Sequence, residues 1–414
     1  MPAASAYPIR AVDAGELARF FTVLESAFGE DFPESELATV TLTAEADRTL
    51  AAFDGDDIVG TAGAYTFDLS VPGGRVPAAG VTYVSVRTTH RRRGLLTAMM
   101  RQQLEDVHER REPVAVLWAS EAAIYGRFGY GVASQLLRIE VDRVDASLRR
   151  DVPDDRDLRL RVVSPDDVRP DIERVEQQLL GTRPGQFSRD KRWIEQLVHD
   201  PESRRGGMSK LECLTVRDGD EVVGYALYRM KPQSVRPHML PDGDLFVFAQ
   251  SALTAQADAA LTRTLLATDL MRRVRWWNRA VDTPLPHQLQ DARHARTTVL
   301  DGLHLRVVDL PTAMAARRYA APVDVVLEVR DALCPWNDGR WHVRGDRSGA
   351  TCDSTDAEPQ IRLDVEALGA AYLGGTTLAT LAAAGRVETS DPDTLARAST
   401  GFGWDVAPWC PVIF

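Results

Sequence analysis

The stretch from residue 81 to residue 130 reads Val81-Thr-Tyr-Val-Ser-Val86, Arg87-Thr-Thr-His-Arg-Arg-Arg-Gly94, a helical pattern, and Ile124-Tyr-Gly-Arg-Phe-Gly-Tyr130. This order predicts a strand, a basic loop and an amphipathic helix that begins at Gly94. The first N–H groups of a helix lack internal partners and its dipole favours negative charge there, so the loop suits a phosphate group. Arg91, Arg92 and Arg93 add charged donors, and Gly94 lets a ligand approach the backbone. The alternative interpretation is a solvated basic turn in front of a surface helix.

The neighbouring segments complete an α/β unit. Residues 95–107 carry apolar side chains on one helical face, and residues 113–119 form a short β-branched run that predicts a buried strand. Upstream, residues 49–65 predict a hairpin that turns at Asp54-Gly55, followed by a second turn at residues 71–75. Residues 16–28 predict a helix whose apolar stripe consists of Leu17, Phe20, Phe21, Leu24 and Phe28. Strand, helix and strand in this order predict a mixed sheet with a crossover helix.

An internal repeat follows. Residues 54–62 (Asp-Gly-Asp-Asp-Ile-Val-Gly-Thr-Ala) match residues 218–226 (Asp-Gly-Asp-Glu-Val-Val-Gly-Tyr-Ala), an offset of 218 − 54 = 164 residues. The same offset places the basic loop over residues 254–258, Thr-Ala-Gln-Ala-Asp, which have neither arginine nor glycine. We therefore expect two copies of one α/β unit, of which only the first can hold an anionic cofactor. The alternative is a chance similarity between two hairpin turns.

The pattern changes after residue 302. Residues 322–329 predict a strand, residues 336–343 a hairpin with a tight turn, and residues 376–385 a helix with a glycine stop. The last residues, 404–414, are nearly all apolar, so we expect this tail to pack against the protein. The fold class is thus α/β plus α+β, with domains at residues 1–150, 151–302 and 303–414.

Composition narrows the possible partners. The chain of 414 residues has a formal net charge of −11, which argues against a general nucleic-acid binder and suits a cationic substrate. Trp276-Trp277 lie among Arg272, Arg273 and Arg275, a combination that could stack on nucleic-acid bases. We instead place this pair on a helix of the second copy, divided between core and surface. The four cysteines are scattered and suggest neither a metal site nor disulfides. The sequence shows no signal peptide and no membrane-spanning run, so we expect a cytoplasmic protein without a membrane partner.

The strings His90-Arg-Arg-Arg-Gly-Leu-Leu-Thr97 and Leu117-Trp-Ala-Ser-Glu-Ala-Ala-Ile-Tyr-Gly-Arg-Phe-Gly-Tyr130 resemble the Eis-type (enhanced intracellular survival) branch of the GCN5-related N-acetyltransferases, or GNATs. The resemblance implies a catalytic GNAT domain, a degenerate second copy, and a C-terminal domain like sterol carrier proteins. The general pyrophosphate motif, Arg/Gln-x-x-Gly-x-Gly/Ala, has Leu96 at its last position here. This departs from the general form but matches the Eis-type string.

The resemblance also implies a role for each site residue. Backbone groups of Val84 and Val86 would bind the pantetheine arm of acetyl-CoA. The pyrophosphate would be held by Arg91, Arg92, Gly94 and Leu95, with Ser120 beside the cofactor. Tyr125 would be the general acid that protonates the departing thiolate, and the α-carboxylate of Phe414 would be the general base. Their alternative roles are core packing for Tyr125 and a docked terminus for Phe414.

For the substrate, the family builds an acidic pocket where Glu25, Glu30, Asp31 and Glu34 follow the first predicted helix, and Tyr83 would line it. The alternative is a solvated acidic loop. We expect a small cationic amine such as an aminoglycoside, acetylated in a ternary complex, and a homo-oligomer, by resemblance a hexamer. The alternatives are acetylation of protein or peptide lysines, and a non-catalytic protein that binds acetyl-CoA or lipid.

Overall fold

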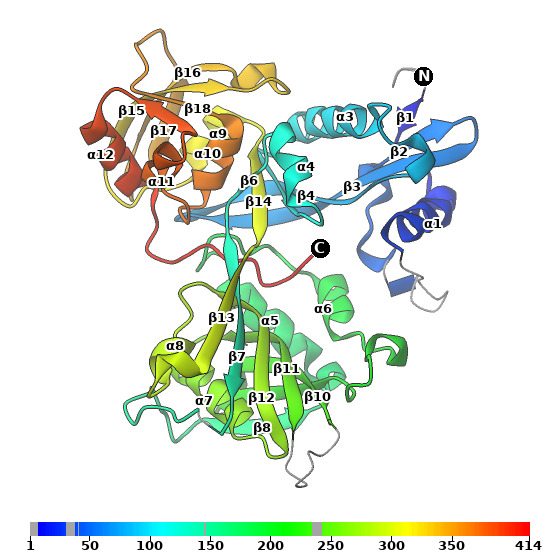
Figure 1. The fold of residues 1–414 in the computed structure, drawn as a ribbon, viewed down its shortest axis with the longest axis vertical. Helices are drawn as coiled ribbons and strands as arrows, with labels where there is room; N and C mark the ends of the chain where they lie inside the picture. The colour runs from blue at the N-terminus through cyan, green and yellow to red at the C-terminus, as the bar shows by residue number, and fades with distance from the viewer. Residues whose placement is uncertain (1–6, 30–37, 40, 145, 234–241) are drawn as a thin grey trace. The chain divides into compact units, whose positions relative to one another are not determined.

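The computed structural model describes residues 7–29, 38–39, 41–144, 146–233 and 242–414, which form two compact units (Figure 1). The first unit comprises Met1–Ser134, Arg183–Phe187 and Asp301–Phe414, and the second comprises Gln135–Thr182 and Ser188–Leu300. None of the helices in the described ranges has the length and apolar character needed to cross a bilayer.

The first unit contains a seven-stranded sheet in the order β1-β2-β3-β4-β5-β14-β6. Its strands are β1 (Ile9–Arg10), β2 (Thr49–Asp54), β3 (Asp57–Val71), β4 (Gly74–Val86), β5 (Val114–Trp118), β6 (Gly131–Val132) and β14 (Leu303–Val307). The predicted hairpin and the second turn are confirmed, and Gly55, with φ 57°, supplies the left-handed residue of the first turn. Strands β4 and β5 are parallel and are connected through α3 (Leu95–Glu109), which confirms the predicted crossover.

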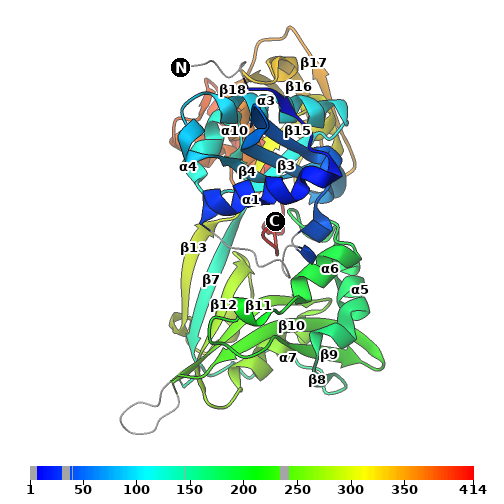
Figure 2. The same cartoon turned by 90° about the vertical axis from the view of Figure 1, so that its right-hand side faces the viewer.

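Helices α1 (Leu17–Phe28) and α3 cover opposite faces of this sheet (Figures 1 and 2). Alternation along β2 explains why: Ala51 and Phe53 pack with α1, whereas Leu50 and Ala52 pack with α3. The predicted apolar stripe of α1 is confirmed for its buried residues Phe20, Phe21 and Leu24. It is wrong for Phe28, the last helical residue, whose side chain is 48% exposed, because a helical period does not reveal where the covered surface ends.

The C-terminal part of the first unit forms a five-stranded sheet in the order β17-β16-β15-β18-β19. Its elements are α9 (Leu310–Ala316), β15 (Val323–Arg330), β16 (Gly339–Gly345), β17 (Ala350–Ser354), β18 (Ile361–Asp364), α10 (Val365–Tyr372), α11 (Leu378–Ala383), β19 (Val387–Thr389) and α12 (Pro392–Phe402). The predicted strand at residues 322–329 and the helix that ends before Gly385 are confirmed. The tail packs as expected, since Cys410 is buried and the N–H of Trp409 donates to the carbonyl of Pro184 at 2.9 Å.

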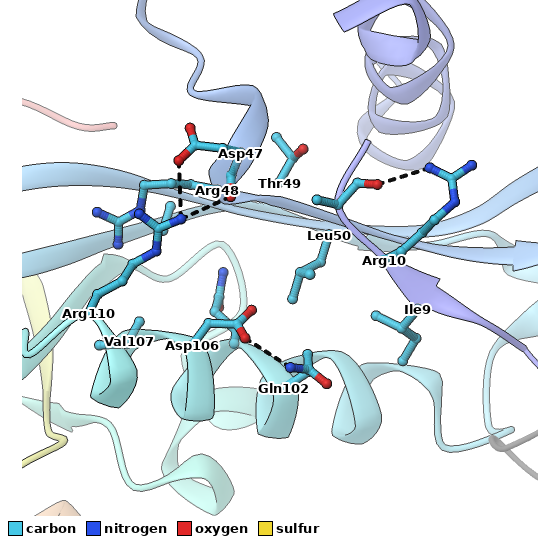
Figure 3. Close-up of a pocket in the computed structure, with 13 residues that line it drawn as sticks. Ile9, Arg10, Asp47, Arg48, Thr49, Leu50, Gln102, Asp106, Val107 and Arg110 are labelled. Atoms are coloured by element: carbon cyan, nitrogen blue, oxygen red, sulfur yellow. Dashed lines mark hydrogen bonds and ion pairs between the residues drawn. The ribbon is translucent and has the colours of Figure 1, made fainter. Parts of the chain in front are cut away.

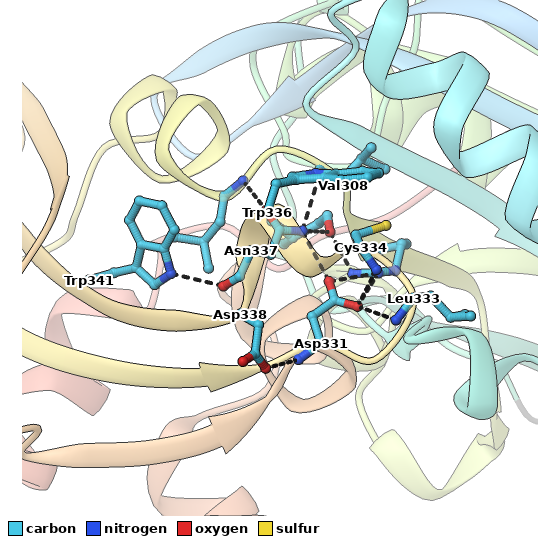
Figure 4. Close-up of polar contacts among 11 residues, drawn as sticks. Val308, Asp331, Leu333, Cys334, Trp336, Asn337, Asp338 and Trp341 are labelled. Carbon is cyan, nitrogen blue, oxygen red and sulfur yellow. Dashed lines mark hydrogen bonds and ion pairs between the residues drawn. The ribbon is translucent and has the colours of Figure 1, made fainter.

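The hairpin predicted at residues 336–343 is wrong. Val329 pairs with Gly339, so β15 and β16 are joined by residues 331–338, which include a 3-10 turn at Pro335–Asn337. Polar contacts hold this connection (Figure 4): Asp331 accepts hydrogen bonds from the Cys334 N–H at 3.0 Å and from the Asn337 amide at 3.0 Å. Both carboxylate oxygens of Asp331 also accept from Arg306 at 2.7 Å. A network centred on one aspartate therefore overrides the local turn pattern.

Replacing Asp331 by Ala should lower the free energy of unfolding by about 3–5 kcal/mol, the usual cost of breaking a buried ion pair. The side chains of Arg306 and Asp331 are 0% and 1% exposed, so the variant leaves a buried guanidinium without its carboxylate. Urea unfolding measures the change. The matched control is Arg347→Ala, which breaks an exposed pair with Asp405 and should leave the unfolding midpoint unchanged. Equal shifts in the two variants would contradict the prediction.

The second unit contains a seven-stranded sheet in the order β13-β7-β12-β11-β10-β9-β8. Its strands are β7 (Gln135–Asp142), β8 (Arg159–Val163), β9 (Glu212–Asp218), β10 (Glu221–Lys231), β11 (Gly243–Ala252), β12 (Met271–Ala280) and β13 (Ala295–Asp301), and its helices are α5 (Arg169–Leu179), α6 (Lys191–Val198), α7 (Ala255–Leu266) and α8 (Leu285–Gln288). The β9–β10 hairpin turns at Gly219, with φ 57° as at Gly55, and α7 joins parallel strands β11 and β12. This arrangement repeats β2, β3, β4, α3 and β5, as the internal repeat predicts.

The helix expected around Trp276-Trp277 is wrong, because these residues belong to β12. The indole N–H of Trp276 donates to Gln250 Oε1 at 2.8 Å, and that of Trp277 donates to the carbonyl of Phe248 at 2.7 Å. The neighbouring arginines form ion pairs with acids, Arg272 with Asp142, Arg273 with Asp244 and Arg275 with Glu140. Both indole donors are therefore engaged within the sheet.

Two strands differ from the expected domain limits of 1–150, 151–302 and 303–414. Strand β7 precedes residue 150 but pairs with β12 in the second sheet, and β14 follows residue 302 but pairs with β5 and β6 in the first. Strand partners are chosen by contacts between residues far apart in the sequence, which a change in local pattern does not report.

Candidate functional site

The basic loop is held in place by residues outside it. His90 Nε2 pairs with Asp54 Oδ2 at 3.0 Å, next to the first hairpin turn. Arg93 donates to the hydroxyl of Tyr7 and, at 3.0 Å, to the carbonyl of Thr89. Arg91 and Arg92 are exposed. Arg93 thus stabilises the loop, Arg91 Nε donates to the carbonyl of Val86 at 3.5 Å, and the side chains of Arg91 and Arg92 remain exposed.

The loop leads into the N-terminus of α3 with its backbone donors open. Gly94, with φ 82°, is the N-cap residue, and no side chain caps the helix. Arg92 also has a positive φ of 63°, so left-handed residues stand on either side of Arg93 and curve the backbone around the helix start. The side chain of Leu95 is 1% exposed, so this residue can contribute its N–H but not its side chain. An uncapped helix N-terminus beside two exposed arginines can accept an anion, and the pyrophosphate role of Arg91, Arg92, Gly94 and Leu95 stays a prediction.

Strand β4 separates from β5 close to this loop. Their parallel pairing ends at Val81 and Leu117, although β4 continues to Val86. On its other edge, the register with β3 shifts between Thr61 and Gly63, and Tyr83 opposite this shift has φ 57°. A Cβ atom on Gly63 would lie 2.8 Å from the Tyr83 ring, so only glycine fits there. Beyond Val81 the β5 side of β4 is thus left for another group, and Val84 and Val86 lie on this part of the strand.

Ser120 and Tyr125 lie where β5 ends. Ser120 is exposed two residues beyond β5, and Tyr125 ends the short helix α4 (Ala122–Tyr125). Tyr125 is 6% exposed and belongs to an apolar cluster that includes Val81 and Leu117, with Val84 packed against it. We call this group the Tyr125 cluster. Burial raises the pKa of the Tyr125 phenol, and the nearby Glu121 adds to the shift, so the phenol stays protonated at neutral pH. The structure places Tyr125 beside the gap between β4 and β5.

Phe414 belongs to a second group of side chains, which we call the acceptor wall: Tyr65, Phe67, Tyr83, Phe187 and Phe414. The Phe414 ring lies 5.0 Å from Phe67, 5.3 Å from Phe187 and 6.3 Å from Tyr65, between ring centroids. The hydroxyl groups of Tyr65 and Tyr83 are hydrogen-bonded to each other, and burial raises the pKa of both. Tyr83 also packs edge-on against Phe20 and Phe21 of α1. Tyr83 and Val84, adjacent in β4, thus connect the acceptor wall with the Tyr125 cluster.

The acidic residues are only partly described. Glu25 lies on α1, one turn after Phe21. Glu30, Asp31 and Glu34 lie outside the described residues.

Three members of the acceptor wall, Tyr65, Phe67 and Phe187, were not predicted from the sequence. The alternation of Tyr65 and Phe67 along β3 was an available signal, whereas nothing near Phe187 in the sequence points to this site.

A cavity of 310 Å³ lies elsewhere, between strands β1 and β2 and the C-terminal half of α3 (Figure 3). None of the predicted site residues lines it. Its arginines form ion pairs, Arg10 with Glu16, Arg48 with Glu112, and Arg110 with Asp47, and Asp106 accepts a hydrogen bond from the Gln102 amide at 2.9 Å. Among the described residues, no group of three or more His, Cys, Asp or Glu side chains could hold a metal ion.

Three family models match successive parts of the chain. An acetyltransferase (GNAT) domain matches residues 8–133, a second acetyltransferase (GNAT) domain matches residues 185–307, and a sterol carrier protein domain matches residues 310–411. The order and the three kinds of domain are those expected from the sequence.

Whole proteins are similar along nearly their full length. An uncharacterized N-acetyltransferase of Streptomyces avermitilis is 47% identical over 397 residues, covering 95% of this chain and 96% of its own. The N-acetyltransferase Eis of Mycobacterium tuberculosis is 36% identical, covering 93% of this chain and 94% of its own. The crystal structure of Eis1 from Mycobacterium abscessus matches with a TM-score of 0.83 and 33% identity, covering 98% of this chain and 100% of that one.

Proposed function

The chain belongs to the Eis-type GNAT N-acetyltransferases, and from this membership we propose that it transfers acetyl from acetyl-CoA directly to an amine of a polycationic small molecule, such as an aminoglycoside. One observation carries the proposal: the separated part of β4 has the acceptor wall at Tyr83 and the Tyr125 cluster at Val84. A cofactor arm laid along β4 would meet an amine held at the acceptor wall.

Binding of acetyl-CoA follows from the loop and the separated strand. The first N–H groups of α3 and the guanidinium groups of Arg91 and Arg92 would bind the pyrophosphate. Backbone groups of Val84 and Val86 would pair with the amides of the pantetheine arm, in place of the ladder that β5 no longer provides. Ser120 lies at the same end of β5 and would flank the arm.

In the reaction, the amine loses a proton to the Phe414 carboxylate and attacks the thioester carbonyl. A carbon–nitrogen bond forms, the carbon–sulfur bond breaks, and Tyr125 donates its proton to the departing thiolate. Transfer is direct rather than through an acetylated cysteine. All four cysteines are buried, and burial raises the pKa of Cys213, Cys334 and Cys352 to about 12, so these three thiols carry little thiolate at neutral pH.

The acceptor wall suits a cationic amine. Aromatic faces attract ammonium groups, with a contribution of about 0.5–2 kcal/mol per contact. The formal net charge of −11 favours the approach of a polycation, and Glu25 on α1 follows the residues that pack against Tyr83. A substrate with several amines can present them in turn, so we propose acetylation at more than one position.

The test measures thiol release from acetyl-CoA with the purified full chain and a panel of aminoglycosides, linear polyamines and lysine peptides. We expect turnover on aminoglycosides. Double-reciprocal plots of the initial rates should intersect, as they do when both substrates bind before reaction. The mass of the protein should not change with acetyl-CoA alone, because direct transfer forms no acetylated enzyme. Turnover on peptides alone would replace the small-molecule substrate with a protein one. Bound acetyl-CoA without turnover on any amine would favour a non-catalytic binding protein.

Replacing Arg91 or Arg92 by Ala should raise the dissociation constant of acetyl-CoA roughly 10- to 100-fold, since a hydrogen bond to a charged group contributes about 1.5–3 kcal/mol. Calorimetric titration with acetyl-CoA measures this, and raising the salt concentration should reduce the difference. Arg101→Ala is the matched control, because Arg101 is an exposed arginine further along α3. Unchanged affinity in the two loop variants would contradict the pyrophosphate role.

On the family resemblance we also propose a cytoplasmic homo-hexamer that has neither a nucleic-acid nor a membrane partner. Light scattering after size-exclusion chromatography should give six times the chain mass of 45.7 kDa. A monomer mass would overturn the assembly proposal without affecting the proposed chemistry.

A further inference from the structure

A five-residue segment, Arg183–Phe187, belongs to the first unit although its flanking residues belong to the second. It lies along the end of β3. The N–H of Gly185 donates to the carbonyl of Ser70 at 2.8 Å, and the N–H of Ser70 donates to the carbonyl of Gln186 at 2.7 Å. Leu69 and Phe187 form an antiparallel bridge. The segment is therefore fixed to β3 by backbone pairing.

The other edge of the same segment holds the C-terminal tail. The N–H of Trp409 donates to the carbonyl of Pro184 at 2.9 Å, and Arg183 Nη1 donates to the carbonyl of Ala407 at 2.6 Å. Gly185 has φ 93°, and a Cβ atom built on it would lie 3.0 to 3.1 Å from backbone atoms of Trp409. Only glycine therefore allows the tail to lie this close.

Phe187 extends this contact to the acceptor wall. Its ring stacks on Phe67 at 4.1 Å between centroids and lies 5.3 Å from Phe414. The five residues thus contact β3, the tail at Ala407 and Trp409, and the last residue of the chain. We propose that Arg183–Phe187 is a tail clamp, which positions Phe414 beside Tyr65 for the reaction. This inference rests on the proposed function, in which Phe414 acts on the acceptor amine.

Gly185→Ala is the variant that tests the tail clamp. The added methyl group has to displace Trp409 backbone, and the left-handed φ disfavours alanine, so the tail should loosen. We expect faster hydrogen exchange in peptides from residues 405–414 and a fall in kcat of roughly 10- to 100-fold, with acetyl-CoA affinity unchanged. The matched control is Gly207→Ala, whose glycine has φ 77° and nothing within 4 Å of its added Cβ. It carries similar backbone strain and should preserve both tail protection and kcat.

Arg183 provides a second, milder variant in case Gly185→Ala misfolds. Arg183→Ala removes the donor to Ala407 and should also speed exchange in the tail and lower kcat, whereas Arg183→Lys keeps a donor and should restore most of both. Unchanged exchange in the tail of Arg183→Ala would overturn the tail clamp. Faster exchange with unchanged kcat would overturn its role in positioning Phe414. If the wild type acetylates no amine, the proposed function fails, while the exchange measurements still decide whether the clamp holds the tail.

Discussion

Replacing Tyr125 by Phe should lower kcat roughly 10²- to 10⁴-fold, the usual contribution of a general acid. The substitution removes one oxygen from a ring that is 6% exposed and packed in an apolar cluster with Val81 and Leu117, so the fold should be preserved. The thiolate would then leave without a proton donor in a site that disfavours its charge. Acetyl-CoA affinity should stay unchanged, because none of the groups assigned to its pyrophosphate or its arm is altered. Steady-state kinetics and calorimetry measure the two quantities.

The matched control is Tyr130→Phe. Tyr130 packs edge-on against Tyr125 at 6.1 Å, and its buried hydroxyl has no hydrogen-bond partner among the described residues, so its loss should leave kcat unchanged. The pH profile provides a further check. Burial raises the pKa of Tyr125 above its ordinary value of 10, so the acid stays protonated below that pH, and kcat should not decline because of Tyr125 until the pH exceeds about 10. A Tyr125→Phe enzyme with the wild-type rate would exclude Tyr125 as the acid.

The parts of the site that lie close together in the sequence could be predicted from it. Gly94 begins α3 with the left-handed conformation that its position required, and the exposed arginines precede it. Tyr125 reaches the gap between β4 and β5 because the short helix that carries it directly follows β5. Each of these placements depends on a turn or a helix start, which short-range backbone preferences determine.

The parts that depend on distant contacts could not be predicted in the same way. Phe187 enters the acceptor wall through a bridge with Leu69, and no local pattern encodes that pairing. Strand β14 pairs with β5 although more than 180 residues separate them in the sequence. The boundary expected at residue 302 therefore assigns β14 to a different domain from the sheet that it belongs to. The sequence predicts a helix at Trp276, whereas the structure has the strand β12, whose arginines pair with acids on β7 and β11. In each case the tertiary partner, not the local propensity, decides the structure.

Converting the α-carboxylate of Phe414 to an amide by semisynthesis should lower kcat roughly 10²- to 10⁴-fold at neutral pH, since the amide cannot accept a proton. The ring would keep its contacts with Tyr65, Phe67 and Phe187, so the tail should stay in place. A carboxylate base also predicts that activity in the unmodified protein falls as the pH drops and the base becomes protonated. The amidated protein should lose this acidic limb together with its rate.

Phe414→Leu provides the opposite change, because it keeps the terminal carboxylate and removes the ring. Loss of one aromatic face should raise KM for the cationic amine by roughly two- to tenfold, in line with about 0.5–1.4 kcal/mol for a cation–π contact. The fall in kcat should be far smaller than in the amidated protein, because the tail stays bound at Ala407 and Trp409. Appending residues after Phe414 should reproduce the effect of the amide, since Phe414 then carries a peptide carbonyl in place of the terminal carboxylate. Full activity in the amidated and the extended proteins would show that Phe414 contributes only to the acceptor wall, and the base would have to be sought among the groups around Tyr83.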